Sequence, residues 1–440
     1  MRLGESWLPS SSDEEKAKPI AASDGEGAVR IGLLGQFGSG NSGNDGSLEA
    51  MVDFLRRAHP DAELVCICSR PDIVTQELAI EARGLGAGHR GGRALARANR
   101  LLLGAPQRLL NLTEALRGTR GLDWLIVPGT GILDDFQENP FGWPFMLWRW
   151  CVAARLNGVR IALVSIGAGP IHHPLSRRFM VSAARLASYR SYRDTLSREY
   201  MRKLRLDTSR DAVFPDLAFG LPAPLPASVA PRRNLIVGLG VMSYRGWLKS
   251  AEGGESIHEL YLTKLARFAL KVLDDGHHLR LLTGDKGDLP AVEAFHRRLS
   301  RLSSRNLQIC VTSEPTTSLS DLMRQLQETD IVVASRYHNV VCALKLGIPT
   351  ISLSYASKND VLMRECGLGD FCQHIESFDV GVLAGQFGKL LAKREECAAR
   401  LNGSLAGIAR ELSRQESLLS ATLGRRAFAA PVATLAASVE

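Results

Sequence analysis

The segment Ser-Arg-Tyr-His at 335–338 holds residues of the types that bind anions and move protons. An apolar run at 330–334 precedes it, and residues 339–347 form a helical pattern closed by a glycine. In parallel α/β sheets, ligands collect at the carboxyl ends of strands and at the helix N-termini that follow. The guanidinium of Arg336 suits a carboxylate or a phosphate, and the imidazole of His338 can transfer protons near neutral pH. The alternative is that both are ordinary loop residues at a helix start.

A glycine-rich loop at 35–46 follows the first predicted strand and is dense in polar side chains. Glycines let backbone N–H groups approach an anion, and Asn41, Asn44 and Asp45 offer polar groups to a substrate. The loop has no Gly-Lys-Ser/Thr sequence, and the next strand is not followed by the acid that binds a ribose in dinucleotide-binding folds. We therefore expect substrate binding here, the alternative being a tight structural turn.

Three further strand ends carry glycines or charged residues. Gly129 and Gly131 form a turn after one predicted strand, where the backbone can approach a substrate. Arg193 ends another strand just before a helix, so it can face a ligand or pair with a nearby acid. Asp216 ends a third strand and can act on a substrate or cap a turn. We treat these four residues as candidate binding residues.

The sequence gives no reason to expect a metal site. His172 and His173 are adjacent, but no carboxylate or third histidine lies near them in the sequence, so exposed loop histidines are the favoured interpretation. The eight cysteines include no CxxC pair, which argues against zinc. Their positions in apolar runs are typical of a reduced cytosolic protein.

The net charge of +8 suggests an anionic partner. The basic residues are scattered and form no module that binds RNA or DNA, so anionic substrates or a weak membrane association explain the charge better than nucleic acid. No window is long and apolar enough to span a membrane, and residues 1–28 lack the apolar core of a signal peptide. We expect a cytoplasmic protein, at most attached to the inner face of a membrane.

Strands and helices alternate along two stretches of the 440-residue chain, over 29–220 and 233–379. Both patterns predict a doubly wound parallel sheet, so the expected fold class is α/β with two Rossmann-like domains and a cleft between them. Four prolines at 221–232 are typical of a linker. We expect a disordered tail over 1–28, and helices with a frayed end over 380–440.

Some expectations concern single elements. We expect the first helix to begin at Ser47 and a strand at 307–311. Aromatic residues are concentrated at 136–150, where they can pack in the core, stack on a sugar, or contact a lipid-linked acceptor at an interface. Core packing is the favoured interpretation. The residues concerned are Phe136, Phe141, Trp143, Phe145, Trp148 and Trp150.

Five motifs occur in a fixed order between residues 29 and 375. They are Gly-Ser-Gly-Asn-Ser-Gly-Asn-Asp at 38–45, Gly-Thr-Gly-Ile-Leu at 129–133, Gly-Ala-Gly-Pro at 167–170, Tyr-Arg-Asp at 192–194, and Ser-Arg-Tyr-His at 335–338 with Gly-Ile-Pro at 347–349 and Ser-Tyr-Ala-Ser-Lys at 354–358. In this order they resemble the motifs of the polysaccharide pyruvyltransferases. Two of them depart from the family: Gly-Thr-Gly at 129–131 replaces a triple glycine, and Gly-Asn-Asp at 43–45 replaces Gly-Asp-Glu.

The resemblance implies two Rossmann-like domains similar to glycosyltransferase-B architecture, with the acceptor against the first and phosphoenolpyruvate against the second. It implies an enzyme that attaches the pyruvyl group of phosphoenolpyruvate as a cyclic ketal across two hydroxyls of a sugar or lipid-linked oligosaccharide, releasing phosphate and needing no cofactor. It places Arg193, Arg336 and His338 at the phosphoenolpyruvate-binding and catalytic positions, with His338 for proton transfer. Ser335 and Lys358 of the last motif join the binding residues.

Two other functions remain open. One is a sugar-nucleotide-dependent glycosyltransferase of the same two-domain fold, and the other is a non-catalytic partner in a polysaccharide assembly complex. The donor that protects the protein against heat unfolding distinguishes the first alternative. Binding without phosphate release would mark the second.

Overall fold

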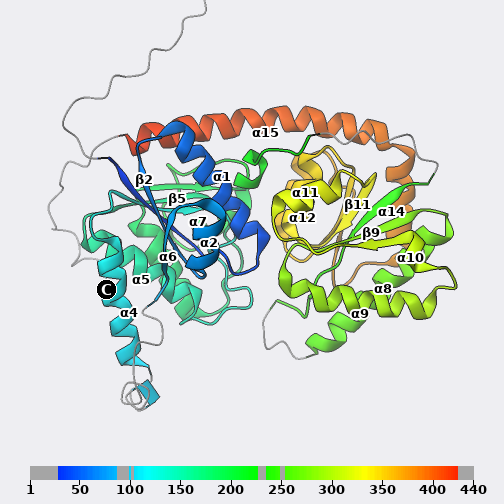
Figure 1. Ribbon diagram of the computed structural model, residues 1–440, viewed down its shortest axis with the longest axis horizontal. Helices are drawn as coiled ribbons and strands as arrows, with labels where there is room; N and C mark the ends of the chain where they lie inside the picture. Colours follow the sequence, from blue (N-terminus) through cyan, green and yellow to red (C-terminus); the bar gives the residue numbers. More distant parts are fainter. Residues whose placement is uncertain (1–27, 87–98, 101–103, 226–233, 248–252, 425–440) are drawn as a thin grey trace, which may run out of the picture.

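The computed structural model describes residues 28–86, 99–100, 104–225, 234–247 and 253–424 (Figure 1). The expected N-terminal tail, most of the expected proline-rich linker and the expected frayed end lie outside these ranges. Among the described residues, no helix is long and apolar enough to cross a membrane.

The first half of the described chain forms a parallel sheet with helices on both faces. Its strands are β1 (Arg30–Leu34), β2 (Glu63–Cys68), β3 (Glu81–Gly84), β4 (Trp124–Pro128), β5 (Arg160–Ile166), β6 (Tyr189–Tyr192) and β7 (Ala212–Val213). Within the described residues they pair in the order β3-β2-β1-β4-β5-β6-β7. The intervening elements are α1 (Ser42–Ala58), α2 (Pro71–Leu78), α4 (Ala105–Thr119), α5 (Trp143–Leu156), α6 (Pro174–Leu186), α7 (Thr195–Lys203) and the 3-10 turn η1 (Leu217–Gly220).

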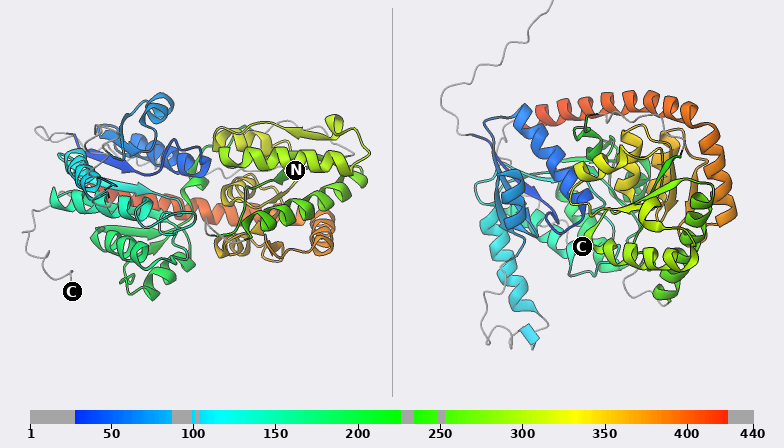
Figure 2. Two further views of the ribbon diagram at one scale, coloured as in Figure 1. Left: turned by 90° about the horizontal axis from the view of Figure 1, so that it is seen from below. Right: turned by 45° about the vertical axis from the view of Figure 1, so that its right-hand side comes forward.

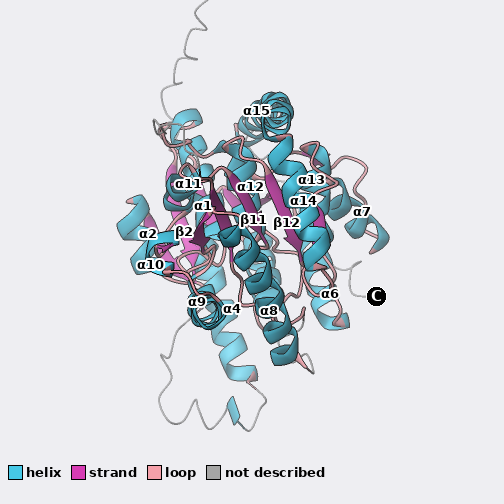
Figure 3. Cartoon of the chain, turned by 90° about the vertical axis from the view of Figure 1, so that its right-hand side faces the viewer, coloured by secondary structure: helices cyan, strands magenta, loops and turns pink. Residues whose placement is uncertain are grey.

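The second half forms another parallel sheet. Its strands are β8 (Ile236–Gly240), β9 (His278–Leu282), β10 (Val311–Ser313), β11 (Ile331–Ala334), β12 (Thr350–Ser354) and β13 (Cys372–His374). In the described part of the chain they pair in the order β10-β9-β8-β11-β12-β13. The helices are α8 (Gly254–Asp274), α9 (Leu289–Leu302), α10 (Leu307–Cys310), α11 (Leu319–Leu326), α12 (Tyr337–Lys345), α13 (Ser357–Glu365), α14 (Val380–Ala392) and α15 (Arg394–Leu423), with a short 3-10 turn η2 (Lys286–Asp288). Figure 3 shows β11 and β12 surrounded by these helices.

Both sheets are buried on both faces, which explains why their strands appear in the sequence as continuous apolar runs. The first sheet separates two apolar clusters, and the second sheet and its helices share one large cluster. The two sheets lie side by side along the long axis of the molecule (Figures 1 and 2). The expected α/β fold with two doubly wound sheets is therefore confirmed.

The long helix α15 returns from the second sheet to the first and spans the top of both in Figure 1. Near its end, Gln415 donates to Ser165 Oγ at 2.7 Å and to Ser191 Oγ at 3.2 Å, all three buried in the first unit. Leu419 and Leu423 join the apolar cluster of α1 and β1. The C-terminal segment thus holds the two units together.

Three local expectations differ from the structure. Helix α1 begins at Ser42 because the Asn41 side chain caps it, accepting from Gly43 N and Asn44 N. Residues 307–311 form the short helix α10 and only the first residue of β10, since Asn306 caps a helical turn there. The expected linker does not begin as an exposed segment, because Leu221 is buried in the apolar cluster of the second unit.

Candidate active site

One cavity opens between the carboxyl ends of the two sheets. The loops after β1, β4 and β6 form one wall, and the loops after β9, β11 and β12 form the other. Parallel sheets of this kind place their ligands at this edge. The cavity is lined by Gln36, Asn41, Asn44, Thr130, Gly131, Ile132, Asp134, Phe136, Glu138, Trp143, Arg193, Gly284, Arg336, Tyr337, His338, Tyr355 and Lys358.

The two walls touch at one edge of the cavity through backbone. Lys286 N donates to Gly40 O at 3.1 Å, and Asn41 and Asp285 form an antiparallel bridge. The loop after β1 therefore meets the loop after β9, and the cavity is closed on this side by peptide groups.

Arg193, directly after β6, carries a buried positive charge into the first wall. Its Nη1 lies 3.2 Å from Asp216 Oδ2 and its Nε lies 3.7 Å from Asp194 Oδ2. Its guanidinium also stacks on the Tyr337 ring at 4.3 Å. Burial alone lowers the pKa of Arg193, but Tyr337 and the two carboxylates outweigh it and raise that pKa, so the side chain remains charged. Gly167 makes this placement possible, because a Cβ there would lie 2.5 Å from Arg193 Nη2.

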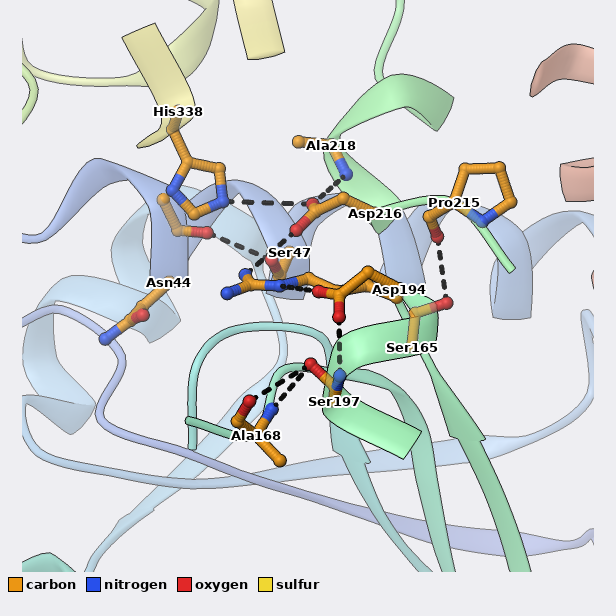
Figure 4. Close-up of polar contacts among 12 residues, drawn as sticks. Asn44, Ser47, Ser165, Ala168, Asp194, Ser197, Pro215, Asp216, Ala218 and His338 are labelled. Atoms are coloured by element: carbon orange, nitrogen blue, oxygen red, sulfur yellow. Dashed lines mark hydrogen bonds and ion pairs between the residues drawn. The ribbon is translucent and has the colours of Figure 1, made fainter. Parts of the chain in front are cut away.

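His338, in the first turn of α12, faces Asp216 across the junction of the two units (Figure 4). Its Nε2 lies 3.8 Å from Asp216 Oδ1, which also accepts from Ala218 N at 3.0 Å. Burial by itself raises the pKa of Asp216, but His338 and Arg193 hold it below its usual range, so the carboxyl is ionised. On the other side of the ring, a Cβ on Gly43 would lie 2.0 Å from His338 Nδ1. The imidazole is thus positioned between an ionised carboxylate and a side-chain-free turn of α1.

Arg336 precedes α12 and forms a two-point ion pair with Asp288. Its Nε and Nη2 lie 2.8 Å and 2.7 Å from the two carboxylate oxygens. Asp288 is fully buried and also accepts from Ser243 N at 2.8 Å. Burial lowers the pKa of Arg336, but Asp288 more than compensates, and the pKa is raised. The arginine side chain is 18% exposed, so part of the guanidinium reaches the cavity.

Lys358, in the first turn of α13, brings a third cation to the cavity. Its Nζ lies 4.8 Å from the Tyr355 ring centre and 5.7 Å from that of Tyr337. Among the described residues it forms no ion pair, in contrast to both arginines. An anionic ligand would therefore find this charge available.

Comparison with family models decides the family. The model described as polysaccharide pyruvyl transferase matches residues 41–357, which is most of the chain. The chain belongs to the polysaccharide pyruvyl transferase family. The matched range includes all the residues that line the cavity except Gln36 and Lys358. No curated protein matches the sequence.

Solved structures share the fold at low sequence identity. UDP-GlcNAc 2-epimerase from Neisseria meningitidis bound to UDP-GlcNAc is 11% identical, with a TM-score of 0.56, 90% of this chain and 99% of that chain covered. A glycosyltransferase from Rickettsia africae is 10% identical, with a TM-score of 0.55 and coverage of 90% and 98%. A putative UDP-N-acetylglucosamine 2-epimerase from Listeria monocytogenes is 11% identical, with a TM-score of 0.55 and coverage of 85% and 91%. These matches confirm the expected glycosyltransferase-B type of architecture.

In this pyruvyl transferase family member, most of the residues predicted from the sequence meet in the cavity. The cavity is lined by both predicted arginines, by the histidine and the lysine, and by polar or glycine residues of the first wall. These residues are Asn41, Asn44, Gly131, Arg193, Arg336, His338 and Lys358.

Four of the predicted residues do not line this cavity. Asp45 accepts from Gly38 N at 2.7 Å and so stabilises its own loop. Gly129 packs on Ser47, since a Cβ there would lie 2.6 Å from that hydroxyl. The other two are buried. Ser335 lies against Tyr261. Both carboxylate oxygens of Asp216 already have partners, namely Arg193, His338 and a backbone N–H. Their places in the structure suit residues that position the cavity lining, and Asp216 also lines a neighbouring cavity with Arg193 and Lys358.

Several groups that line the cavity were not predicted from the sequence. Asp134 follows the glycine turn after β4, a stretch noted in the sequence but not assigned a side chain. Tyr337 and Tyr355 separate the cations and belong to the motifs already quoted. Motif membership could have indicated them, but the direction of each side chain comes only from the fold.

The aromatic residues at 136–150 divide among three environments. Trp143 and Trp150 are buried in the first core, as favoured. Phe136 lines the cavity and packs edge-on against Trp247 at 5.0 Å. Phe145 and Trp148 lie 5.7 Å apart and both pack against Phe179 of α6. The sequence cluster is therefore not a single platform.

Proposed function

We propose that this protein transfers the pyruvyl group of phosphoenolpyruvate to two hydroxyls of a sugar as a cyclic ketal, releasing phosphate. The observation that supports it is the meeting of Arg193, Arg336, Lys358 and His338 in one cavity lined from both units. Phosphoenolpyruvate carries a carboxylate and a phosphate, so it needs more than one cation. The family match supports a transferase of this type.

The three cations have different roles in the proposed complex. Arg193 and Arg336 are already neutralised in part by buried carboxylates, which fix their direction. Lys358 adds a charge that forms no ion pair among the described residues. A trianionic donor is then held by two oriented forks and one mobile ammonium, and charge-assisted contacts of this kind contribute about 1.5–3 kcal/mol each.

His338 is the proposed base that takes the proton from the attacking hydroxyl. The ionised Asp216 faces its Nε2, so it orients the ring and stabilises the imidazolium that forms. The lack of a side chain at Gly43 lets the ring pack directly on α1, since a Cβ there would lie 2.0 Å from Nδ1. The ring also lines the cavity in which the hydroxyl would bind. A general base typically raises the reaction rate about 10²–10⁴-fold.

The acceptor is proposed to bind along the first wall. Asn41 and Asn44 present amides there, and Gln36 Nε2 donates to Glu138 Oε1 at 3.1 Å. These groups suit sugar hydroxyls, and Phe136 offers an aromatic face beside them. The acceptor is a sugar of a polysaccharide or a lipid-linked precursor, and attachment at the inner face of a membrane belongs to the same proposal. The reaction as written needs no metal or nucleotide.

A sugar-nucleotide-dependent transfer is the second candidate, because the Neisseria structure of the same fold holds UDP-GlcNAc. The two donors are separated by ligand-dependent unfolding. A ligand at 100 times its Kd stabilises the native state by about 2.7 kcal/mol. We expect phosphoenolpyruvate to raise the unfolding temperature and UDP-sugars to leave it unchanged; the reverse result would favour the glycosyltransferase.

The direct test is phosphate release from phosphoenolpyruvate with galactose-, glucose- and mannose-containing acceptors. We expect release only when donor and a suitable acceptor are both present, and none from His338→Gln. The control is His296→Gln, an exposed histidine on α9 far from the cavity lining. Phosphate release unchanged in His338→Gln would remove the catalytic assignment, and donor binding without release from the wild type would indicate a non-catalytic partner.

A further inference from the structure

We propose that Asp134 is the acid that protonates the methylene carbon of phosphoenolpyruvate. This inference rests on the proposed function and assigns the one proton transfer that His338 leaves open. Ketal formation adds one proton to carbon and removes one from each hydroxyl, so a single base cannot account for all three transfers.

The turn after β4 points one carboxyl oxygen of Asp134 into the cavity. Asp134 Oδ1 accepts from Phe136 N at 3.1 Å, which fixes the side chain. The backbone that carries it is unusual, since Gly129 and Thr130 both have positive φ, +58° and +65°. A non-glycine residue at positive φ is uncommon and marks a turn held by its surroundings. Among the described residues, no hydrogen bond or ion pair fixes Oδ2.

The space in front of Oδ2 is surrounded by the donor-binding cations. A Cβ built on Gly131 would lie 3.0 Å from Asp134 Oδ2, 3.5 Å from Arg193 Nη2 and 3.8 Å from Lys358 Nζ. Two cations from opposite walls and one carboxyl oxygen therefore lie close together beside Gly131, a place we call the Gly131 point, where a side chain would crowd them. An anionic group bound between the two cations lies within reach of Asp134.

The opposite side of the same carboxyl is also kept free of side chains. A Cβ on Gly169 would lie 3.2 Å from Asp134 Cβ, closer than most Cβ contacts. Gly167 makes room for Arg193 in the same way. The Gly-Ala-Gly turn after β5 thus serves to seat Asp134 and Arg193, which explains a motif that itself does not line the cavity.

The environment of Asp134 raises the pKa of its carboxyl above the usual value. Burial is the largest influence and raises the pKa of Asp134, and it outweighs the opposite effects of Lys358, the Phe136 N–H and Arg193. Asp216 and Asp288, in contrast, each pair closely with an arginine. A carboxyl without a close arginine partner is the one suited to donate a proton.

The other candidate acids of the wall are occupied. Within the described residues, Glu138 is the second carboxyl that lines the cavity, and it accepts from Gln36 Nε2 at 3.1 Å and from Trp143 N at 3.3 Å. Asp135, next in sequence, is buried and accepts from His173 N at 2.9 Å. Neither lies beside Lys358 and Arg193 at the Gly131 point.

The proposed steps return both groups to their starting states. Asp134 gives its proton to the methylene carbon while the first hydroxyl bonds to the neighbouring carbon and gives its proton to His338. The bond from that carbon to the phosphate oxygen then breaks, and His338 returns its proton to the departing phosphate. The second hydroxyl bonds to the same carbon and gives its proton to the Asp134 carboxylate. One proton has moved to carbon and one to phosphate, as the products require.

The test compares Asp134→Asn, Asp134→Glu and Asp135→Asn. We expect Asp134→Asn to lower kcat by at least about 100-fold, the usual contribution of a general acid, while the rise in unfolding temperature caused by phosphoenolpyruvate is kept. Asp134→Glu should recover part of kcat with a shifted alkaline limb of the pH profile, and Asp135→Asn should keep kcat within about threefold of the wild type.

The outcomes distinguish a failure of the role of Asp134 from a failure of the proposed pyruvyl transfer. A wild-type protein that neither binds phosphoenolpyruvate nor releases phosphate would overturn both. Normal release from the wild type together with near-normal kcat in Asp134→Asn would overturn the role of Asp134 alone. An equal loss in Asp135→Asn, or an unshifted pH profile in a partly active Asp134→Glu, would show that the turn acts structurally and would also overturn it.

Discussion

The two walls of the cavity each place an arginine directly after a strand, but they hold it differently. In the first wall, Arg193 is nearly inaccessible, with a side chain 3% exposed, and lies between Asp194 and Asp216. In the second wall, Arg336 is 18% exposed and pairs with the single carboxylate of Asp288. One positive charge therefore faces two acids in the first wall and one acid in the second.

Because of this difference, the charges of the first wall are fixed in ion pairs, whereas the second wall keeps a charge that a ligand can bind. The surplus negative charge of the first wall acts on His338, whose ring faces Asp216 from the other unit. The second wall supplies Lys358, a cation with no ion pair among the described residues. The first wall therefore sets protonation and direction, and the second wall offers charge to the ligand.

The largest expected effect is the loss of unfolding free energy when either arginine is removed, and it tests this contrast between the walls. Arg193→Met leaves two buried carboxylates without their cation and should cost about 3–5 kcal/mol of unfolding free energy. Arg336→Met should lower the unfolding free energy less, by about 1–3 kcal/mol, because it leaves only one carboxylate without its cation and Asp288 keeps the hydrogen bond from Ser243 N. Denaturant unfolding measures both.

A double variant serves as the control for the arginine comparison. Asp216→Asn added to Arg193→Met removes one of the two unpaired charges and should recover part of the loss. A larger destabilisation from Arg336→Met than from Arg193→Met would contradict the contrast between the walls.

Gly43→Ala tests the contact between the walls. The new methyl would lie 2.0 Å from His338 Nδ1, so the ring must turn away while the helix survives. We expect a loss of about 100-fold or more in kcat for phosphate release, with unfolding changed little. Gly385→Ala is the matched control, because a Cβ there meets nothing within 4 Å. Equal activity in the two variants would show that the position of His338 is unimportant.

Lys358→Met tests the available charge of the second wall. Because this ammonium has no internal ion pair among the described residues, its loss should leave stability within about 0.5 kcal/mol. The KM for phosphoenolpyruvate should rise about 10–100-fold, the value of one charge-assisted contact. Steady-state kinetics and thermal unfolding measure the two effects. A stability loss as large as that of Arg336→Met would show that Lys358 is a structural group.

The effect most remote from the ligand concerns Asp45, at the junction of the walls. Burial is the main cause that raises its pKa to about 6, against a hydrogen bond from Gly38 N–H. Because the folded-state pKa lies above the unfolded value, stability is fully present below about pH 4 and is lost as pH rises through 6. Asp45→Asn should therefore be more stable than the wild type at pH 7.5, by about 1–3 kcal/mol, and equal to it near pH 3.5.

The exposed Asp61→Asn is the control for that pH comparison. Unfolding temperatures of both variants and the wild type at the two pH values are sufficient. A stability difference for Asp45→Asn that does not change with pH would contradict the role of burial.

Local pattern was enough to predict most of the elements. Two parallel sheets follow from alternating apolar runs and helices, because strands buried on both faces must be apolar throughout. The errors at Ser47 and 307–311 arose from side-chain caps, Asn41 and Asn306, which extend or create helical turns irrespective of the apolar period.

The residues proposed to carry the chemistry were identified by type and position, since strand ends before helices are where anions bind. The sequence by itself determined the two α/β units, the family resemblance, and Arg193, Arg336, His338 and Lys358 as charged groups at one edge. Only the tertiary structure decided that Asp216 serves His338 and Arg193, and that Asp134 shares a point with Lys358. The physical reason is that a side chain's protonation and direction depend on neighbours distant in sequence, which two sheets bring together only when α15 and η1 hold them side by side.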